Sequence, residues 1–242
     1  MSRYPADHAG LEILPFDRCL QLLSTATVGR VSFFADGEIV VLPVNHVMDG
    51  HDPVFRTARG SKLSAAAGQR RMRHPLIRGC RPARPGQPRP SSAEHEMTRY
   101  PADHAGLEIL PFDRCLQLLS TVPVGRVSFL ADGEIVVLPV NHVMDGPDPV
   151  FRTARGSKLS AAEGQNVVAF EADGYDERTQ AGWSVLVNGR AQAIYDDAEI
   201  QRLSRLGLRP WVSAADRPFW IRIRPTSITG RRTPDLEDGQ ER

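Results

Sequence analysis

Apolar residues in the second half of the chain follow a helical spacing in some stretches and a strand spacing in others. Behind Pro111, four apolar residues recur at intervals that place them on one helix face: Phe112, Cys115, Leu116 and Leu119. We therefore expect a short helix here, with Cys115 buried as a small hydrophobe. Two further short helices are expected at 157–163 and 198–206, the second closed by Gly207.

Six stretches have the character of strands, because they alternate apolar and polar residues or are apolar almost throughout: 126–130, 135–144, 150–153, 167–172, 183–195 and 219–224. Pro139 falls inside the second stretch, so a bulge or a sheet edge is expected there. In the sixth, Ile221 and Ile223 face a core, whereas Trp220 belongs to the opposite face. Six mostly antiparallel strands with a few short helices predict a mainly β (α+β) fold, a small closed β-barrel.

The first half of the chain repeats part of the second. Residues 3–69 match residues 99–165 at a constant offset of 96, and 62 of the 67 positions are identical. The differences are Ala26/Val122, Thr27/Pro123, Phe34/Leu130, His51/Pro147 and Ala67/Glu163. One repeat with a long insert is not a solenoid, so the pattern indicates a tandem duplication of part of a domain.

The repeat divides the chain into three parts. Residues 1–69 (the truncated copy) carry strands one to three only, residues 70–96 form a linker, and residues 97–242 (the barrel domain) hold the complete set. The linker has seven Arg and five Pro, so we expect it to be disordered, with a functional basic arm as the alternative. Three strands cannot close a barrel. The truncated copy is therefore expected to stay unfolded or to exchange with its counterpart, leaving residues 1–96 dispensable.

Charge and cysteine content limit which partners and which cellular compartment are expected. The net charge is +1, and the barrel domain has 17 basic and 20 acidic side chains, which argues against a nucleic-acid partner. No signal peptide or bilayer-length apolar run is visible, so no membrane association is expected. The three cysteines, Cys19, Cys80 and Cys115, form no disulfide framework, which favours a cytoplasmic setting. No Cys/His spacing indicates a metal site.

One stretch has the chemistry of a phosphate site. Near the end of the third strand of the barrel domain lies Arg152, and a helix is expected to start at Ser157, followed by Lys158. A helix N-terminus presents free N–H groups, Ser157 could cap the helix and contact an anion, and Arg152 and Lys158 supply charge. The alternative is an ordinary Ser N-cap beside solvated cations. The chain's only two lysines, Lys62 and Lys158, occupy this same position of the repeat.

Three ring side chains are candidate ligand contacts. Trp183 and Trp220 would most often serve packing in a barrel, and stacking on a planar ligand is the alternative. His142 follows Asn141 at a strand end, where a surface position is expected; a cofactor-tuning role is the alternative.

Five motifs in this order resemble the flavin-binding split-barrel proteins of the pyridoxamine 5′-phosphate oxidase-like family. They are Val-Gly-Arg-Val at 124–127, Val-Leu-Pro-Val-Asn at 137–141, Phe-Arg-Thr with Gly-Ser-Lys-Leu within 151–159, Gly-Trp-Ser-Val-Leu-Val-Asn-Gly-Arg-Ala at 182–191, and Pro-Thr with Ile-Thr-Gly-Arg within 225–231. The truncated copy carries only the first three motifs.

The resemblance implies an FMN-binding split β-barrel that dimerises, with the flavin at the dimer interface. It implies that Leu138, Pro139, Val140 and Asn141 line the isoalloxazine, largely through backbone groups. The phosphate would be held by Arg152, Thr153, Ser157 and Lys158. Trp183 and Ser184 would approach the flavin from the fifth strand, and Arg231 would reach the cofactor from the C-terminal region.

The resemblance also has a departure. True pyridoxamine-phosphate oxidases have further basic residues near the C-terminus, whereas here Arg231-Arg232-Thr233-Pro234 runs into an acidic tail. The resulting hypothesis is an FMN-dependent oxidoreductase acting on a small-molecule substrate as a homodimer. The alternatives are a deazaflavin-dependent reductase, a flavin-binding protein without catalysis, and a haem-binding protein with His142 as first candidate ligand.

Overall fold

The computed structural model of the protein describes residues 5, 12–35, 37–57, 100–103, 105–209 and 217–234. The expected Arg/Pro-rich linker at 70–96 lies outside the described residues, as do Lys62 and Cys80. None of the described helices is long and apolar enough to cross a membrane.

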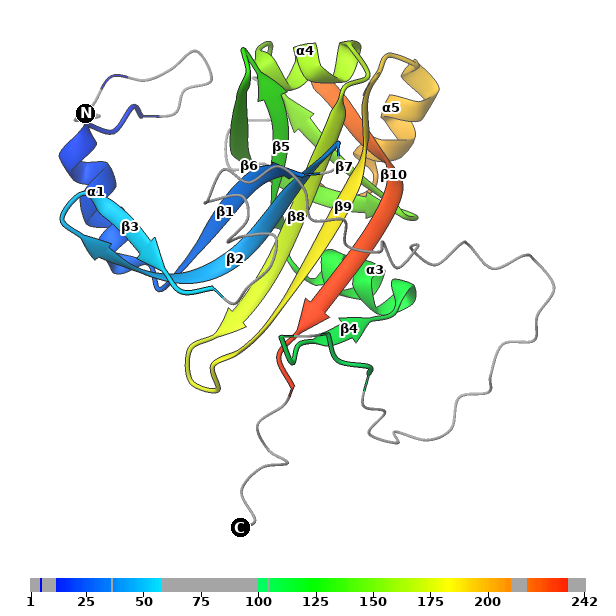
Figure 1. Ribbon diagram of the computed structural model, residues 1–242. Helices are drawn as coiled ribbons and strands as arrows, with labels where there is room; N and C mark the ends of the chain where they lie inside the picture. The colour runs from blue at the N-terminus through cyan, green and yellow to red at the C-terminus, as the bar shows by residue number, and fades with distance from the viewer. Residues whose placement is uncertain are drawn as a thin grey trace.

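Six strands of the barrel domain close on themselves. They are β5 (Val124–Ala131), β6 (Glu134–Asp145), β7 (Asp148–Thr153), β8 (Val167–Asp176), β9 (Ala181–Ile194) and β10 (Phe219–Arg232). Their order is β10-β7-β6-β5-β8-β9, and β9 pairs again with β10, so the ring is complete and all its pairings are antiparallel. This confirms the predicted mainly β split barrel (Figure 1).

The remaining elements cover the ends and one side of the barrel. A short strand, β4 (Glu108–Leu110), pairs with the end of β10, and α3 (Phe112–Thr121) follows it. The other helices are α4 (Ser157–Glu163) and α5 (Asp197–Ser204). The apolar face of α3 packs into the barrel core, and Cys115 within it is fully buried, as its spacing predicted.

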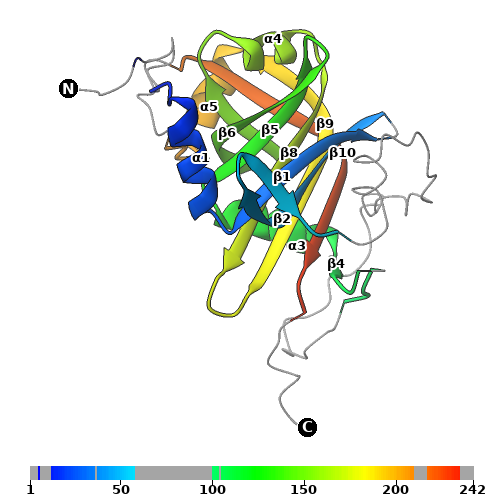
Figure 2. The same cartoon turned by 60° about the vertical axis from the view of Figure 1, so that its left-hand side comes forward.

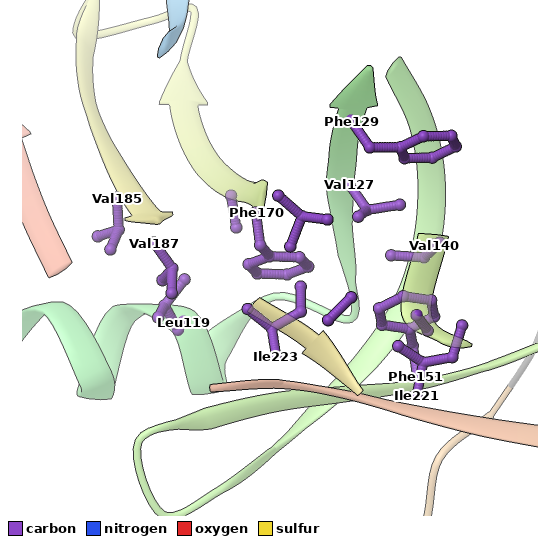
Figure 3. Packing of buried hydrophobic residues seen from close by; sticks show 14 of the residues in the cluster. Leu119, Val127, Phe129, Val140, Phe151, Phe170, Val185, Val187, Ile221 and Ile223 are labelled. Carbon is purple, nitrogen blue, oxygen red and sulfur yellow. The ribbon is translucent and has the colours of Figure 1, made fainter. Parts of the chain in front are cut away.

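The barrel interior is filled by inward-pointing apolar side chains from every strand. Phe129, Phe151 and Phe170 are fully buried and lie among Val and Ile side chains from neighbouring strands (Figure 3). Ile221 and Ile223 point into this core, as the alternation predicted. Trp220 points outward but is also buried, in a second cluster that includes Leu203 of α5. Trp220 therefore serves packing.

Pro139 lies at an edge of the sheet, which is one of the two arrangements expected for it. It pairs with Arg126 of β5 without a register shift, whereas the pairing of β6 with β7 begins only at His142. The first part of β6 therefore has a strand neighbour on one side only. A proline, which lacks a backbone N–H, is tolerated at such a position.

The truncated copy folds like the matching part of the barrel domain. It contains α1 (Phe16–Thr25), β1 (Val28–Ala35), β2 (Glu38–Asp49) and β3 (Asp52–Phe55), in one antiparallel sheet ordered β1-β2-β3. The β1–β2 register repeats that of β5–β6 at the offset of 96: Val28 faces Asn45 as Val124 faces Asn141. These residues are therefore neither unfolded nor exchanged with their counterparts, so both expected outcomes are wrong for them.

The truncated copy is held by its sheet, which packs against the outside of the barrel. Ile39 and Val41 of β2 are each 1% exposed and form a cluster with Ala169 of β8. Leu186 of β9 packs against the same cluster. Figures 1 and 2 show β2 crossing β8 and β9. Three strands that are too few to be stable alone are thus ordered by burial against a preformed surface.

A buried charge cluster joins the two parts beside this apolar contact. Arg30 of β1 pairs with Asp173 of β8 through two contacts, one of them Nε to Oδ2 at 2.7 Å. Arg126 of β5 reaches Oε2 of Glu171 at 3.3 Å and Oδ1 of Asp173 at 3.5 Å. Glu171 is fully buried, and burial together with the Asp173 carboxylate raises its pKa to about 8, although both arginines oppose this shift.

We predict that this glutamate makes the protein less stable as the pH rises. The folded state holds the Glu171 proton up to a pH of about 8, whereas the unfolded chain releases it near the ordinary value of 4.5. Folded protein thus binds more protons between these values, and its free energy of unfolding falls by at most about 1.4 kcal/mol per pH unit for one such group. Denaturation in urea measures the free energy of unfolding from pH 4.5 to 8.5. This free energy should fall less steeply with pH in Glu171→Gln than in the unmodified protein. Parallel profiles for the two proteins would contradict the buried, protonated state.

A second prediction uses the repeat as its own control. A Cβ on Gly125 would overlap the ring of Phe170 and lie 3.0 Å from the Glu171 carbonyl oxygen. Gly125→Ala should therefore lower the free energy of unfolding by about 1–3 kcal/mol. The matched change Gly29→Ala meets only the His46 ring, at 3.1 Å, and should cost less than about 1 kcal/mol. Equal shifts of the urea midpoint for the two variants would contradict this packing.

Candidate functional site

A cavity of about 910 Å³ lies between the truncated copy and the barrel domain. One wall is formed by β2, β3 and the residue after β3, and the other by the ends of β8, β9 and β10. The lining is mostly apolar and includes three arginines: Arg56, Arg231 and Arg232. Its volume is within the range of sites that hold drug-sized ligands.

The barrel wall of the cavity is set by the β9–β10 ladder. Ser184 faces Arg231 and Trp183 faces Arg232 across this ladder. The indole of Trp183 also lies against Gly174 of β8, because a Cβ built on that glycine would be 2.5 Å from Nε1 of the tryptophan. A glycine is therefore required here, because a side chain at this position would overlap the indole.

Two of the three lining arginines are neutralised by carboxylates of the barrel domain. The Nε of Arg231 lies 3.1 Å from Oδ2 of Asp103. The Nε of Arg232 lies 2.5 Å from Oε2 of Glu108. Although burial opposes ionisation of Asp103, backbone hydrogen bonds and Arg231 hold its pKa below the usual value. Both arginines are therefore fixed in place.

Arg56 differs from these two arginines. It is exposed, follows directly after β3, and forms no ion pair with any of the residues that the structure describes. Its charge is thus available to a ligand in the cavity. It lies on the same wall as Pro43 and Asn45 of β2, and all three line the cavity.

The site residues predicted for the barrel domain fall into separate groups. Trp183, Ser184 and Arg231 line the cavity. Arg152 pairs with Trp220 at the opposite end of β10. Arg231 lies eleven positions after Trp220 along the strand, which corresponds to roughly 35 Å at about 3.3 Å per residue. One barrel alone does not bring these two groups to one ligand.

Some of the residues predicted to bind phosphate instead make contacts within the barrel domain. The Nε of Arg152 donates to the Arg217 carbonyl at 2.7 Å, its guanidinium lies 5.6 Å from the centroid of the Trp220 ring, and burial lowers its pKa. Thr153 is 3% exposed. The helix α4 is capped by Gly156, with no side-chain hydrogen bond, so the expectation that Ser157 caps it is wrong. Ser157 is exposed and Lys158 half-buried.

The four residues predicted to line the isoalloxazine, 138–141, differ in how far they are buried. Val140 points into the barrel core at 3% exposure, so only its backbone could face a ligand. Pro139 is exposed, and Leu138 and Asn141 are half-buried. None of these four residues lines the cavity, whereas three of their repeat counterparts, Pro43, Val44 and Asn45, do.

His142 is not at the surface, so the expected position is wrong. It is 4% exposed, its Nε2 lies 2.9 Å from the Leu119 carbonyl oxygen, and its ring packs edge-on against Phe170. Burial holds its pKa below the usual value, although the Leu119 hydrogen bond opposes this. A ring enclosed under α3 in this way packs as part of the core. Among the described residues, no three His, Cys, Asp or Glu side chains gather as metal ligands.

Two residues of the truncated copy line the cavity although the sequence predicted no role for them. Asn45 and Arg56 carry the same motif residues as Asn141 and Arg152, so the repeat itself marked them. Local pattern gives them no role, because three strands alone are too few to form a stable fold. Gly174 was missed because its effect, the placement of Trp183, depends on a cross-strand contact.

Comparison with known proteins gives relatives that match between 37% and 56% of the chain. "Uncharacterized protein Rv0080" of Mycobacterium tuberculosis is 34% identical over 142 residues, which are 56% of this chain and 92% of that protein. "Uncharacterized protein Rv3129" of the same species is 42% identical over 89 residues, 37% of this chain and 78% of that protein. The solved structure of the FAD-binding protein from Mycobacterium smegmatis is 39% identical, covers 52% of this chain and 99% of its own, and has a TM-score of 0.45.

A family model matches both parts of the chain. The model described as pyridoxamine 5′-phosphate oxidase matches residues 16–77 and residues 112–232. The first segment covers the truncated copy from residue 16 and continues into the linker as far as residue 77, the second falls on the barrel domain, and together they cover more than half of the chain. The chain therefore belongs to the pyridoxamine 5′-phosphate oxidase family.

Proposed function

We propose that the protein binds FMN in the cavity between the truncated copy and the barrel domain and acts as a flavin-dependent oxidoreductase on a small-molecule substrate. The observation that carries this proposal is the pairing of an aromatic, apolar wall at Trp183 with the uncommitted cation of Arg56 in one cavity. FMN combines a planar ring system with a phosphate, and these two features require such surroundings.

The ring system would be held by the apolar side chains of the cavity. Trp183 on β9 and Phe55 on β3 line it, together with Pro43 and the valines of β2. Aromatic side chains bind planar ligands by offset stacking or edge contacts, which contribute about 0.5–1.5 kcal/mol beyond the burial of area. Because Trp183 rests on Gly174, its orientation is fixed before the ligand binds.

The polar edge of the ring requires hydrogen-bonding partners in the same wall. At Asn45 the strand β2 is paired with β1 only, since its pairing with β3 begins at His46. An exposed side-chain amide at a one-sided stretch of strand suits a heterocycle that has both donors and acceptors. Ser184 supplies a hydroxyl on the facing wall.

The phosphate would be bound by Arg56. A guanidinium forms charge-assisted, often bidentate, hydrogen bonds with phosphate oxygens. Arg231 and Arg232 add positive potential, although their own carboxylate partners reduce it. The bound flavin supplies the electron-transfer chemistry, while the chain binds and orients it and restricts access of water.

The visible absorption spectrum of the protein, purified and then reconstituted with FMN, tests this function. We expect a flavin-type spectrum, tight binding of FMN, and bleaching of the absorbance by a reductant that is reversed by an electron acceptor. A deazaflavin spectrum or a Soret band in the purified protein would contradict the FMN assignment. Tight binding without any turnover would leave a flavin-binding protein without catalysis.

A third prediction concerns the support of Trp183. Gly174→Ala should displace the indole and weaken FMN binding by about tenfold, which corresponds to about 1.4 kcal/mol. Trp183→Ala should weaken binding by a similar factor. Once the indole is absent, adding Gly174→Ala should cause little further loss. Titration of the three variants with FMN measures this, and additive losses would show that Gly174 does not act through Trp183.

A further inference from the structure

The two parts of the chain meet in the manner of two protomers related by a two-fold axis. Strand β1 contacts β6, and β2 contacts β5. At the offset of 96, β1 is the counterpart of β5, and β2 is the counterpart of β6. Exchanging the two copies therefore turns the β1–β6 contact into the β5–β2 contact, and the reverse. Such reciprocity is the defining property of an isologous interface between identical surfaces.

The contact between the two copies is complete on the β2 side and incomplete on the β6 side. Val41 of β2 is buried against β8 and β9 at 1% exposure, whereas its counterpart Val137 of β6 is 36% exposed. The reason is in the sequence: the repeat ends at residue 69, so the truncated copy has no counterparts of β8, β9 or β10 that could cover Val137. Only one of the two symmetric interfaces is therefore built.

The cavity lies at the interface that is built. Its truncated-copy wall carries Asn45 and Arg56, and its barrel wall carries Trp183 and Arg231. The equivalent cavity beside Asn141 would need second copies of the residues on the barrel wall, which the repeat does not contain. Arg152 itself is held by Arg217 and Trp220.

We infer that the truncated copy is a covalently attached substitute for a partner protomer, which completes one cofactor site within a single chain and supplies its phosphate-binding residue, Arg56. This inference rests on the proposed function. It replaces the expected homodimer, and it makes residues 12–57 part of the binding machinery instead of a dispensable remnant. One chain then holds one flavin.

Two pairs of matched variants test the inference, because each residue has an identical counterpart 96 positions away. Arg56→Ala should weaken FMN binding by about tenfold to a hundredfold, and by far more than Arg152→Ala. Riboflavin lacks the phosphate, so its affinity should change little in Arg56→Ala. This comparison separates loss of a phosphate contact from general damage to the cavity.

The second pair tests the docked arrangement. Val41→Asp places a charge in the apolar contact with β8 and β9 and should release the truncated copy, so that FMN affinity falls by about tenfold or more. Val137→Asp changes a partly exposed position and should leave affinity within about twofold of that of the unmodified chain. Circular dichroism and thermal melting of both variants verify that the barrel domain remains folded.

The outcomes distinguish this inference from the proposed function. If the unmodified chain does not bind FMN, the proposed function fails. If it binds FMN but Arg152→Ala and Val137→Asp are the damaging changes, two barrel domains from different chains form the site, and the inference is overturned while the function stands. Equal effects within each pair would also overturn it.

Discussion

The contact of Ile39 and Val41 with β8 and β9 is the interaction on which the arrangement depends. Fully burying an aliphatic side chain of this size contributes about 1.5–3 kcal/mol. Two such residues, with the Arg30–Asp173 pair beside them, offset part of the entropy lost when a short segment is ordered. Without this contact the sheet would lose its support, the cavity would lose one wall, and Trp183 would face solvent.

The duplication shows that the same sequence is buried to different extents in different surroundings. In the barrel domain, Leu119 on α3 is fully buried because the closed barrel surrounds it, whereas Leu23 on α1 is 43% exposed. The same helix therefore belongs to a core in one place and leaves its apolar face open in the other. The truncated copy retains a three-stranded docking surface but not a core of its own, which suits an element that completes a neighbouring site.

Local pattern was sufficient for much of the fold. The resemblance, and not the pattern, named Trp183, Ser184 and Arg231, which line the cavity. The alternation around Ile221 and the helical spacing around Cys115 report burial directly, since each depends on short-range periodicity. His142 was expected at the surface, but it is buried by α3, an element remote from it in sequence. Whether the truncated copy would fold could not be seen, because its stability comes from a surface formed by β8 and β9. Arg56 became a candidate only once the cavity beside it was known.

The mass and cofactor content of the flavin-loaded protein in solution test the central claim most directly. Native mass spectrometry of the full chain with excess FMN reports the number of chains and of bound flavins in a single particle. A self-contained site predicts one chain with one FMN, with no dimer required for binding. A particle of two chains carrying two FMN molecules, with monomers free of flavin, would contradict it.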